Sequence, residues 1–258
     1  ISTPSATPSS AVSTLVYADR LMELPTALLG VALGVVLTPQ MSAARAQGDM
    51  VAYSALLDWG LRLVLILALP CAVALAVFGQ PMVAVLFHRG AFDANAVAMT
   101  TLAVMGYGAG VIGLVGVKVA APAYYAQQDM ATPMRVAIGA LVLTQVLNAA
   151  LIGGLGMGVA ALALSIGLAA NANAGALVWG LKRRGSYQPA AGWGALVLKV
   201  VLASAVMGAG MAWAARRFDW LAMGAHELLR AGAMALALAL SAAVYFGVLA
   251  ALGVPLRS

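Results

Sequence analysis

Apolar residues fill the chain in seven long runs, and shorter stretches with polar or charged residues separate these runs. A helix of about 20 apolar residues crosses the hydrocarbon core of a bilayer, because it rises about 1.5 Å per residue. The pattern therefore predicts an all-α polytopic membrane protein with about seven transmembrane helices. The predicted spans cover residues 13–38, 56–78, 94–121, 134–152, 159–181, 193–215 and 228–252.

The polar stretches predict where these spans end. Residues 1–12 are rich in Ser, Thr and Pro and predict a flexible polar lead-in before the transmembrane lobe of residues 13–258. Pro39 is expected to end the first span, with residues 40–53 as a polar connection. Residues 82–87 are too few to cross a bilayer and predict a short, separate interfacial helix.

Composition supports a membrane protein. The chain is 64% hydrophobic and 9% charged, with a mean hydropathy of +0.99, whereas a soluble domain is about half apolar and a quarter charged. Long apolar runs, rather than segments of alternating hydrophobicity, favour helices over a β-barrel. Gly106 and Gly110 have the small-xxx-small spacing that lets two helices approach closely in lipid.

Several chemistries are not predicted. The net charge of +6 comes from basic residues at helix ends, which suits anionic head groups, and no nucleic-acid-binding motif accompanies them. Cys71 is the only cysteine, and His88 and His226 lack the spacing of metal ligands. We find no catalytic set of side chains and no phosphate-binding glycine loop, so the sequence predicts neither an enzyme nor a cofactor or metal site.

The first span carries three charged residues at positions where a bilayer makes charge costly. Glu23 follows Arg20 by three residues and Asp19 by four, so its carboxylate can contact either side chain. If Glu23 neutralises Arg20 only in part, the guanidinium stays available to an anionic ligand. The alternative is a structural salt bridge to a neighbouring helix. Pro25 is expected to kink the helix one turn later.

Other polar residues within spans allow two interpretations each. Lys118, near the end of the third span, can extend to the interface or face a cavity. Gln145 and Asn148 lie on one helix face, where they can hydrogen-bond to another helix or line a cavity. Asp58 and Arg62, four residues apart, are predicted to anchor the start of the second span.

Lysine and arginine are more frequent on one side of the predicted membrane. The connections after the first, third and fifth spans, together with the C-terminal tail, contain Arg45, Arg135, Lys182, Arg183, Arg184 and Arg257. The opposite side contains Arg89, Arg216, Arg217 and Arg230. The distribution predicts a cytoplasmic C-terminus and places Arg20 in the outer half of the membrane.

Several collinear segments resemble the MurJ (MviN) family of bacterial lipid II flippases. The first covers residues 17–25 (YADRLMELP), and the glycine-containing residues 29–34 (LGVALG) follow it. The resemblance continues through residues 57–62 (LDWGLR), 86–92 (LFHRGAF), 118–122 (KVAAP), 124–129 (YYAQQD), 132–133 (TP) and 164–168 (LSIGL).

This resemblance implies a fold and a function. Members of the family have fourteen spans in two lobes and belong to the multidrug/oligosaccharidyl-lipid/polysaccharide (MOP) exporter superfamily, and this chain is similar to the C-terminal lobe. The implied partners are lipid II, membrane lipids and the N-terminal lobe, in the bacterial inner membrane. The resemblance also implies alternating access, with Arg20 facing the cavity and binding the pyrophosphate while Asp19 and Glu23 adjust its charge or take part in gating. It implies that the last two spans form an apolar groove for the polyprenyl tail.

The resemblance also bears on a metal site. Some relatives place sodium next to an asparagine like Asn148 and a carboxylate one turn later, but this chain has Ile152 there, and we therefore expect no metal.

Two alternative functions remain open from the sequence. One is a drug or ion antiporter of the same superfamily, which needs a carboxylate deep in the lobe, whereas most acidic residues here lie at span ends. The other is a membrane scaffold that transports nothing and uses its buried charges only to hold subunits together. A scaffold would tolerate Arg20→Lys, whereas a bidentate contact to pyrophosphate would not.

Overall fold

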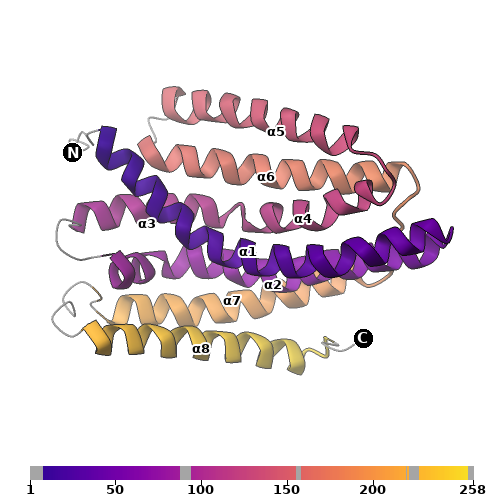
Figure 1. The fold of residues 1–258 in the computed structure, drawn as a ribbon. Coiled ribbons are helices and arrows are strands. Elements are labelled where there is room, and N and C mark those ends of the chain that lie inside the picture. Colours follow the sequence, from indigo (N-terminus) through magenta and orange to yellow (C-terminus); the bar gives the residue numbers. More distant parts are fainter. Residues whose placement is uncertain (1–7, 88–93, 155–157, 219, 221–226, 255–258) are drawn as a thin grey trace.

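The computed structural model describes residues 8–87, 94–154, 158–218, 220 and 227–254, and the regular elements of these residues are all helices (Figure 1). Seven segments are long and apolar enough to cross a membrane, which confirms the predicted fold class. The helices are α1 (Pro8–Ala46), α2 (Met50–Phe87), α3 (Ala94–Gly108), α4 (Val111–Tyr125), α5 (Ala131–Asn148), the π-helical extension η1 (Ala149–Gly154), α6 (Gly158–Arg183), α7 (Trp193–Arg217) and α8 (Glu227–Ala251).

The predicted ends of the first two spans are wrong, because the helices continue through their prolines. α1 passes Pro39 and ends at Ala46, so that only residues 47–49 connect it to α2. α2 passes Pro81 and includes residues 82–87, which are therefore not a separate helix. α1 begins at Pro8, within the predicted lead-in. A proline removes one backbone hydrogen bond, and packing against neighbouring helices compensates for that loss.

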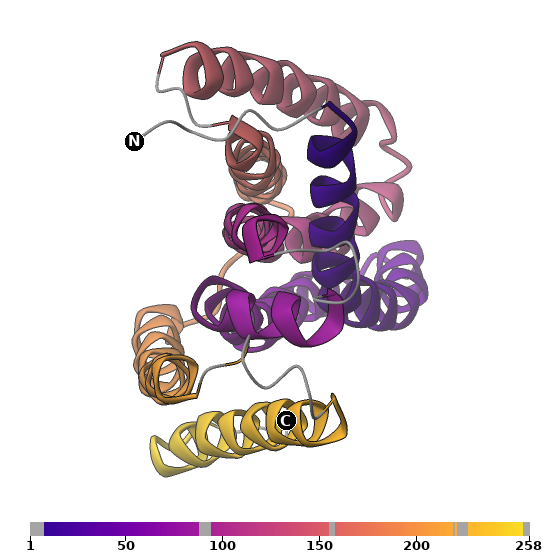
Figure 2. The same ribbon diagram turned by 90° about the vertical axis from the view of Figure 1, so that its left-hand side faces the viewer.

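α1 also bends along its length (Figures 1 and 2), and Pro25 lies inside it. Its first turns run obliquely across the bundle, and the remainder lies beside α2. A proline inside a helix is a known cause of such a bend, and α1 contains both Pro25 and Pro39.

The third predicted span consists of two helices. α3 and α4 are separated at Ala109–Gly110, and α4 extends past Pro122 to Tyr125. The side-chain amide of Asn171 on α6 donates a 2.7 Å hydrogen bond to the carbonyl of Ala109 at this break. A Cβ atom added to Gly110 would lie 2.3 Å from the Cα of Gly167, so the two backbones are in direct contact. The predicted close approach of helices at this motif is confirmed.

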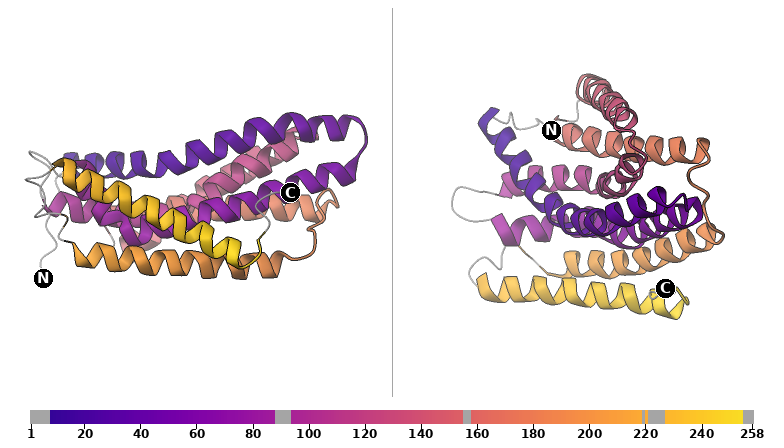
Figure 3. Two further views of the ribbon diagram at one scale, coloured as in Figure 1. Left: turned by 90° about the horizontal axis from the view of Figure 1, so that it is seen from below. Right: turned by 45° about the vertical axis from the view of Figure 1, so that its right-hand side comes forward.

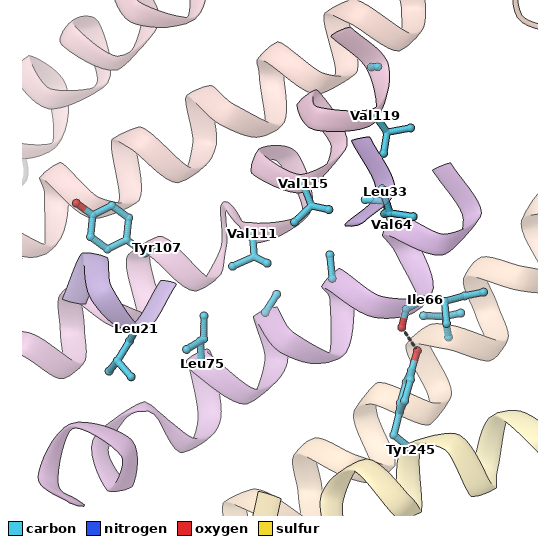
Figure 4. Close-up of a cluster of buried hydrophobic side chains, with 14 of the residues drawn as sticks. Leu21, Leu33, Val64, Ile66, Leu75, Tyr107, Val111, Val115, Val119 and Tyr245 are labelled. Carbon is cyan, nitrogen blue, oxygen red and sulfur yellow. Dashed lines mark hydrogen bonds between the residues drawn. The ribbon is translucent and has the colours of Figure 1, made fainter. Parts of the chain in front are cut away.

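The helices form layers on either side of α2. Figure 1 shows α5 outermost on one side, followed by α6, then α3 and α4, then α1 with α2, and finally α7 and α8. α8 crosses α7 obliquely (Figure 3). The core contains buried Leu33, Val64, Val115 and Val119, where α1, α2 and α4 meet (Figure 4).

The two ends of the chain lie at opposite ends of the bundle (Figure 1), as an odd number of crossings requires. The end that holds the C-terminus also holds the connections α1–α2, α4–α5 and α6–α7. Most of the basic residues counted above for the cytoplasmic side lie in or next to these connections. The cytoplasmic position of the C-terminus stays a prediction.

Candidate functional site

The three charged residues of α1 lie on its exposed surface. Asp19, Arg20 and Glu23 are all exposed, and a guanidinium nitrogen of Arg20 lies 3.4 Å from a carboxylate oxygen of Glu23. The side chains of Arg20 and Glu23 are 72% and 58% exposed, so this ion pair is loose and contributes little to stability. Of the two acidic neighbours, Glu23 is therefore the one that pairs with Arg20. Most of the guanidinium donors of Arg20 remain available to a ligand.

An open groove of about 880 Å³ runs along this face of α1. Arg20 and Glu23 lie at one end, and apolar side chains of α1 and the last residues of α2 form the rest. The lining residues are Arg20, Leu21, Glu23, Leu24, Ala27, Leu28, Val31, Ala32, Leu86 and Phe87. The groove thus joins a polar end, where Arg20 and Glu23 carry opposite charges, to an apolar wall.

Lys118 reaches α1 from α4. Its ammonium group donates a 3.1 Å hydrogen bond to the carbonyl of Thr26, and its aliphatic stem crosses Gly30, where an added Cβ would lie 2.1 Å from Lys118 Cδ. Lys118, whose side chain is exposed overall, therefore contacts the main chain of α1. Lys118 is also absent from the groove lining, and it supports α1 from the side facing α4.

Gln145 and Asn148 lie apart from the charged face of α1. They belong to α5, which packs against α6 at the edge of the bundle opposite α8 (Figure 2). Gln145 is exposed, whereas the side-chain oxygen of Asn148 is buried without a hydrogen-bond partner among the described residues. The structure therefore does not bring this pair together with Arg20.

A second, apolar groove of about 360 Å³ lies between α7 and α8. Its walls include Trp213, Phe218 and Trp220 from the α7 side and Leu236 and Leu240 from α8. The groove that the resemblance implied in the last two spans is present. Apart from Ser241 and the indole N–H groups of Trp213 and Trp220, the described lining is apolar, so the groove suits a hydrocarbon chain rather than a head group.

The sequence alone identified the Asp58–Arg62 pair but not its full role. The carboxylate of Asp58 accepts hydrogen bonds from Arg62 (2.6 Å), Tyr187 (2.8 Å) and the indole of Trp193 (2.7 Å). Asp58 is only 5% exposed. The pair therefore ties α2 to the connection between α6 and α7, which spacing along the sequence cannot indicate.

A second polar cluster closes the same end of the bundle. Arg184 donates to the carboxylate of Asp129 at 2.6 Å and to the hydroxyl of Thr132 at 2.8 Å. Hydrogen bonds from Thr132 and Arg184 hold the pKa of the Asp129 carboxyl well below its usual range. This cluster joins the α4–α5 and α6–α7 connections. No group of three or more metal-ligating side chains occurs in the described ranges.

The fold and these surfaces define a class: a multi-pass helical membrane protein with an exposed cluster of charged residues on one of its spanning helices. The sequence profile of the family described as "Lipid II flippase MurJ" matches residues 3–232. The chain belongs to the MurJ family.

Curated relatives support this assignment. The "Lipid II flippase MurJ" of Burkholderia cenocepacia is 48% identical over 246 residues, which are 94% of this chain and 47% of that protein. The "Probable lipid II flippase MurJ" of Vibrio cholerae is 33% identical over 251 residues, which are 96% of this chain and 47% of that protein. The chain therefore spans about half the length of these relatives.

A solved structure shows the same fold. The chain superimposes on "Lipid II flippase MurJ, inward closed conformation" with a TM-score of 0.69 and 20% identity, covering 92% of this chain and 47% of that one. The match supports the helix arrangement described above.

Proposed function

We propose that this chain is the C-terminal half of a lipid II flippase of the bacterial inner membrane, with its C-terminus in the cytoplasm. The observation that carries the proposal is the groove of about 880 Å³ on α1, where a loosely paired Arg20 lies at one end of an apolar wall. Family membership supports it, because the relatives bear the printed name lipid II flippase. The basic residues at the C-terminal end of the bundle support the orientation.

In this proposal Arg20 binds the pyrophosphate of lipid II. A guanidinium group can contact two phosphate oxygens at once, and each such charge-assisted bond is stronger in a site that excludes water. Glu23 shares one guanidinium nitrogen and thereby weakens the hold on the anion, which allows release. Asp19 is exposed on the same turn of α1 and adds a second negative charge beside Arg20, which further limits how tightly the arginine holds an anion.

The polyprenyl tail is proposed to lie in the groove between α7 and α8 while the head group crosses along α1. The tail groove is apolar, so the tail exchanges one hydrocarbon environment for another. The exposed face of α1 is proposed to meet the N-terminal half of the transporter, which completes the cavity. Rocking of the two halves would then expose Arg20 first to one side of the membrane and then to the other.

The experiment joins this chain to the N-terminal half of the Burkholderia cenocepacia relative, in cells depleted of their own flippase. Lipid II on the outer face is scored with an added enzyme that cleaves it. We expect Arg20→Ala and Arg20→Lys each to lower exposure at least about tenfold, because a charge-assisted contact contributes about 1.5–3 kcal/mol. Arg45→Ala and Arg45→Lys, in the last turn of the same helix, are the matched controls and should keep the parent rate. Normal exposure with both Arg20 variants would overturn the assignment.

A further inference from the structure

The hairpin of α7 and α8 is attached to the rest of the bundle through α2. Its two helices pack against each other and against α2, and they form one edge of the bundle (Figure 1). The groove that we propose for the lipid tail lies between these two helices. The contacts with α2 therefore decide whether the groove can move independently of the lobe.

The first tie lies at the end of α2 where α7 begins. One oxygen of the Asp58 carboxylate accepts hydrogen bonds from Tyr187, from the indole of Trp193 and from the backbone N–H of Ala190 (3.2 Å). The Arg62 guanidinium lies 5.3 Å from the centre of the Trp193 ring and donates a 2.9 Å bond to the Ala191 carbonyl. Trp193 is the first residue of α7, so this end of the helix is fixed to α2.

The second tie joins the middle of α2 to α8. The hydroxyl of Tyr245 donates a 2.5 Å hydrogen bond to the carbonyl of Ile66 (Figure 4). Pro70 follows Ile66 by four residues and has no N–H, so this carbonyl lacks its usual partner within the helix. Tyr245 is 1% exposed. The buried hydroxyl of Tyr245 on α8 therefore supplies the hydrogen bond that Pro70 removes from α2.

The third tie lies at the opposite end of α2. Arg230 is 1% exposed and donates a 3.2 Å hydrogen bond to the carbonyl of Val85. Val85 lies in the last turn of α2, where carbonyl groups have no partner within the helix and carry a partial negative charge. From Asp58 to Val85 the helix rises about 40 Å, so the ties extend along most of α2.

We propose that α2, α7 and α8 move as one rigid body throughout the transport cycle, so that the α7–α8 groove does not open as a separate gate. Separating the hairpin from α2 would leave the Ile66 carbonyl without its partner in an apolar layer. It would also remove the Trp193 bond from Asp58 and the Val85 bond from Arg230. This inference rests on the proposed function, because it concerns the groove assigned to the tail. The part of α1 that lies beside α2 therefore keeps a constant position relative to the tail groove.

A disulfide between α2 and α7 tests the proposal. A Cβ atom added to Gly208 would lie 2.8 Å from a methyl carbon of Val73, so the Val73→Cys and Gly208→Cys pair is close enough to bond. The pair is placed in the chimera that carries the N-terminal half of the Burkholderia cenocepacia relative, with Cys71→Ala to remove the native thiol. Each single cysteine variant is a control for the effect of oxidant alone.

Lipid II exposure is then compared before and after oxidation. If the hairpin stays on α2, the cross-linked protein exposes lipid II at the rate of its reduced form. If the hairpin must swing, oxidation abolishes exposure and a reductant restores it, which would overturn the inference. A reduced chimera that exposes no lipid II would count against the proposed function instead.

Spin-label distances decide the inference independently of transport. Labels on the exposed residues Val51 of α2 and Leu228 of α8 should give one narrow distance distribution with and without added lipid II. Tyr245→Phe should broaden it, whereas Tyr125→Phe, at an exposed position on α4, should not. A distribution that shifts when lipid II is added to the parent protein, or that Tyr245→Phe leaves unchanged, would contradict the proposal.

Discussion

Alanine at Gly110 would place a methyl group inside the contact between α4 and α6. The added Cβ would lie 2.3 Å from the Cα of Gly167, whereas carbon atoms in contact prefer about 3.5–4.0 Å. The two backbones would have to separate by more than about 1 Å, and the contact of Gly113 with Ala170, where an added Cβ would lie 2.4 Å from the Ala170 carbonyl carbon, would loosen as well.

We expect this substitution to lower the free energy of unfolding by about 3 kcal/mol, at the upper end of the range for overpacking, because a backbone atom cannot rotate away. The thermal midpoint should fall by roughly 5–10 °C. Unfolding is followed in detergent by the reaction of a thiol-reactive dye with Cys71. This residue is the only cysteine, and it is half-buried in the folded protein, so unfolding exposes it to the dye.

Gly175→Ala is the matched control on α6. An added Cβ there meets nothing within 4 Å, and alanine favours a helix over glycine by up to about 1 kcal/mol. Its midpoint should stay equal to the parent's or rise slightly. Equal midpoints for the Gly110 and Gly175 variants would refute the reasoning that backbone contact holds α4 against α6.

Two further predictions concern polar contacts. Gly30→Ala should displace the aliphatic stem of Lys118, so Gly30→Ala and Lys118→Met should lower lipid II exposure by similar amounts. The double variant should lower exposure no further than either single variant. Additive losses would count against a shared contact. Asp129→Asn should lower the thermal midpoint at pH 7. Because the folded pKa of Asp129 lies below the unfolded value of about 3.9, its stabilisation is complete above that value. The difference from the parent should therefore be constant between about pH 5 and 8 and should shrink as the pH falls further. A difference that varies between pH 5 and 8 would contradict this.

The sequence predicted the spans because a long apolar segment in a bilayer satisfies all of its backbone hydrogen bonds by forming a helix. It misplaced the ends at Pro39 and Pro81, because a proline releases one carbonyl and tertiary contacts decide whether the helix continues. The Ile66 carbonyl released by Pro70 shows how this works, since its partner Tyr245 lies 179 residues away along the chain.

The charged face of α1 was predictable because charges are rare in this chain and three of them lie within five residues. Helical spacing allowed Glu23 to contact either Arg20 or Asp19, and the structure shows the contact with Arg20. The network around Asp58 was not predictable, because Tyr187 and Trp193 lie 129 and 135 residues away. The partner of Lys118 was likewise hidden, because only the crossing of α4 over Gly30 brings its ammonium group to Thr26.

The central claim is that lipid II binds along the exposed face of α1 through Arg20. Photo-cross-linking in the chimera tests it most directly, with a photoreactive amino acid placed at Ala27, which lines the groove, or at Ala43, which is exposed on the same helix outside it. We expect lipid II to be captured at position 27 and not at position 43, and Arg20→Ala to abolish the capture. Equal capture at both positions, or capture at position 27 that does not depend on Arg20, would contradict the account.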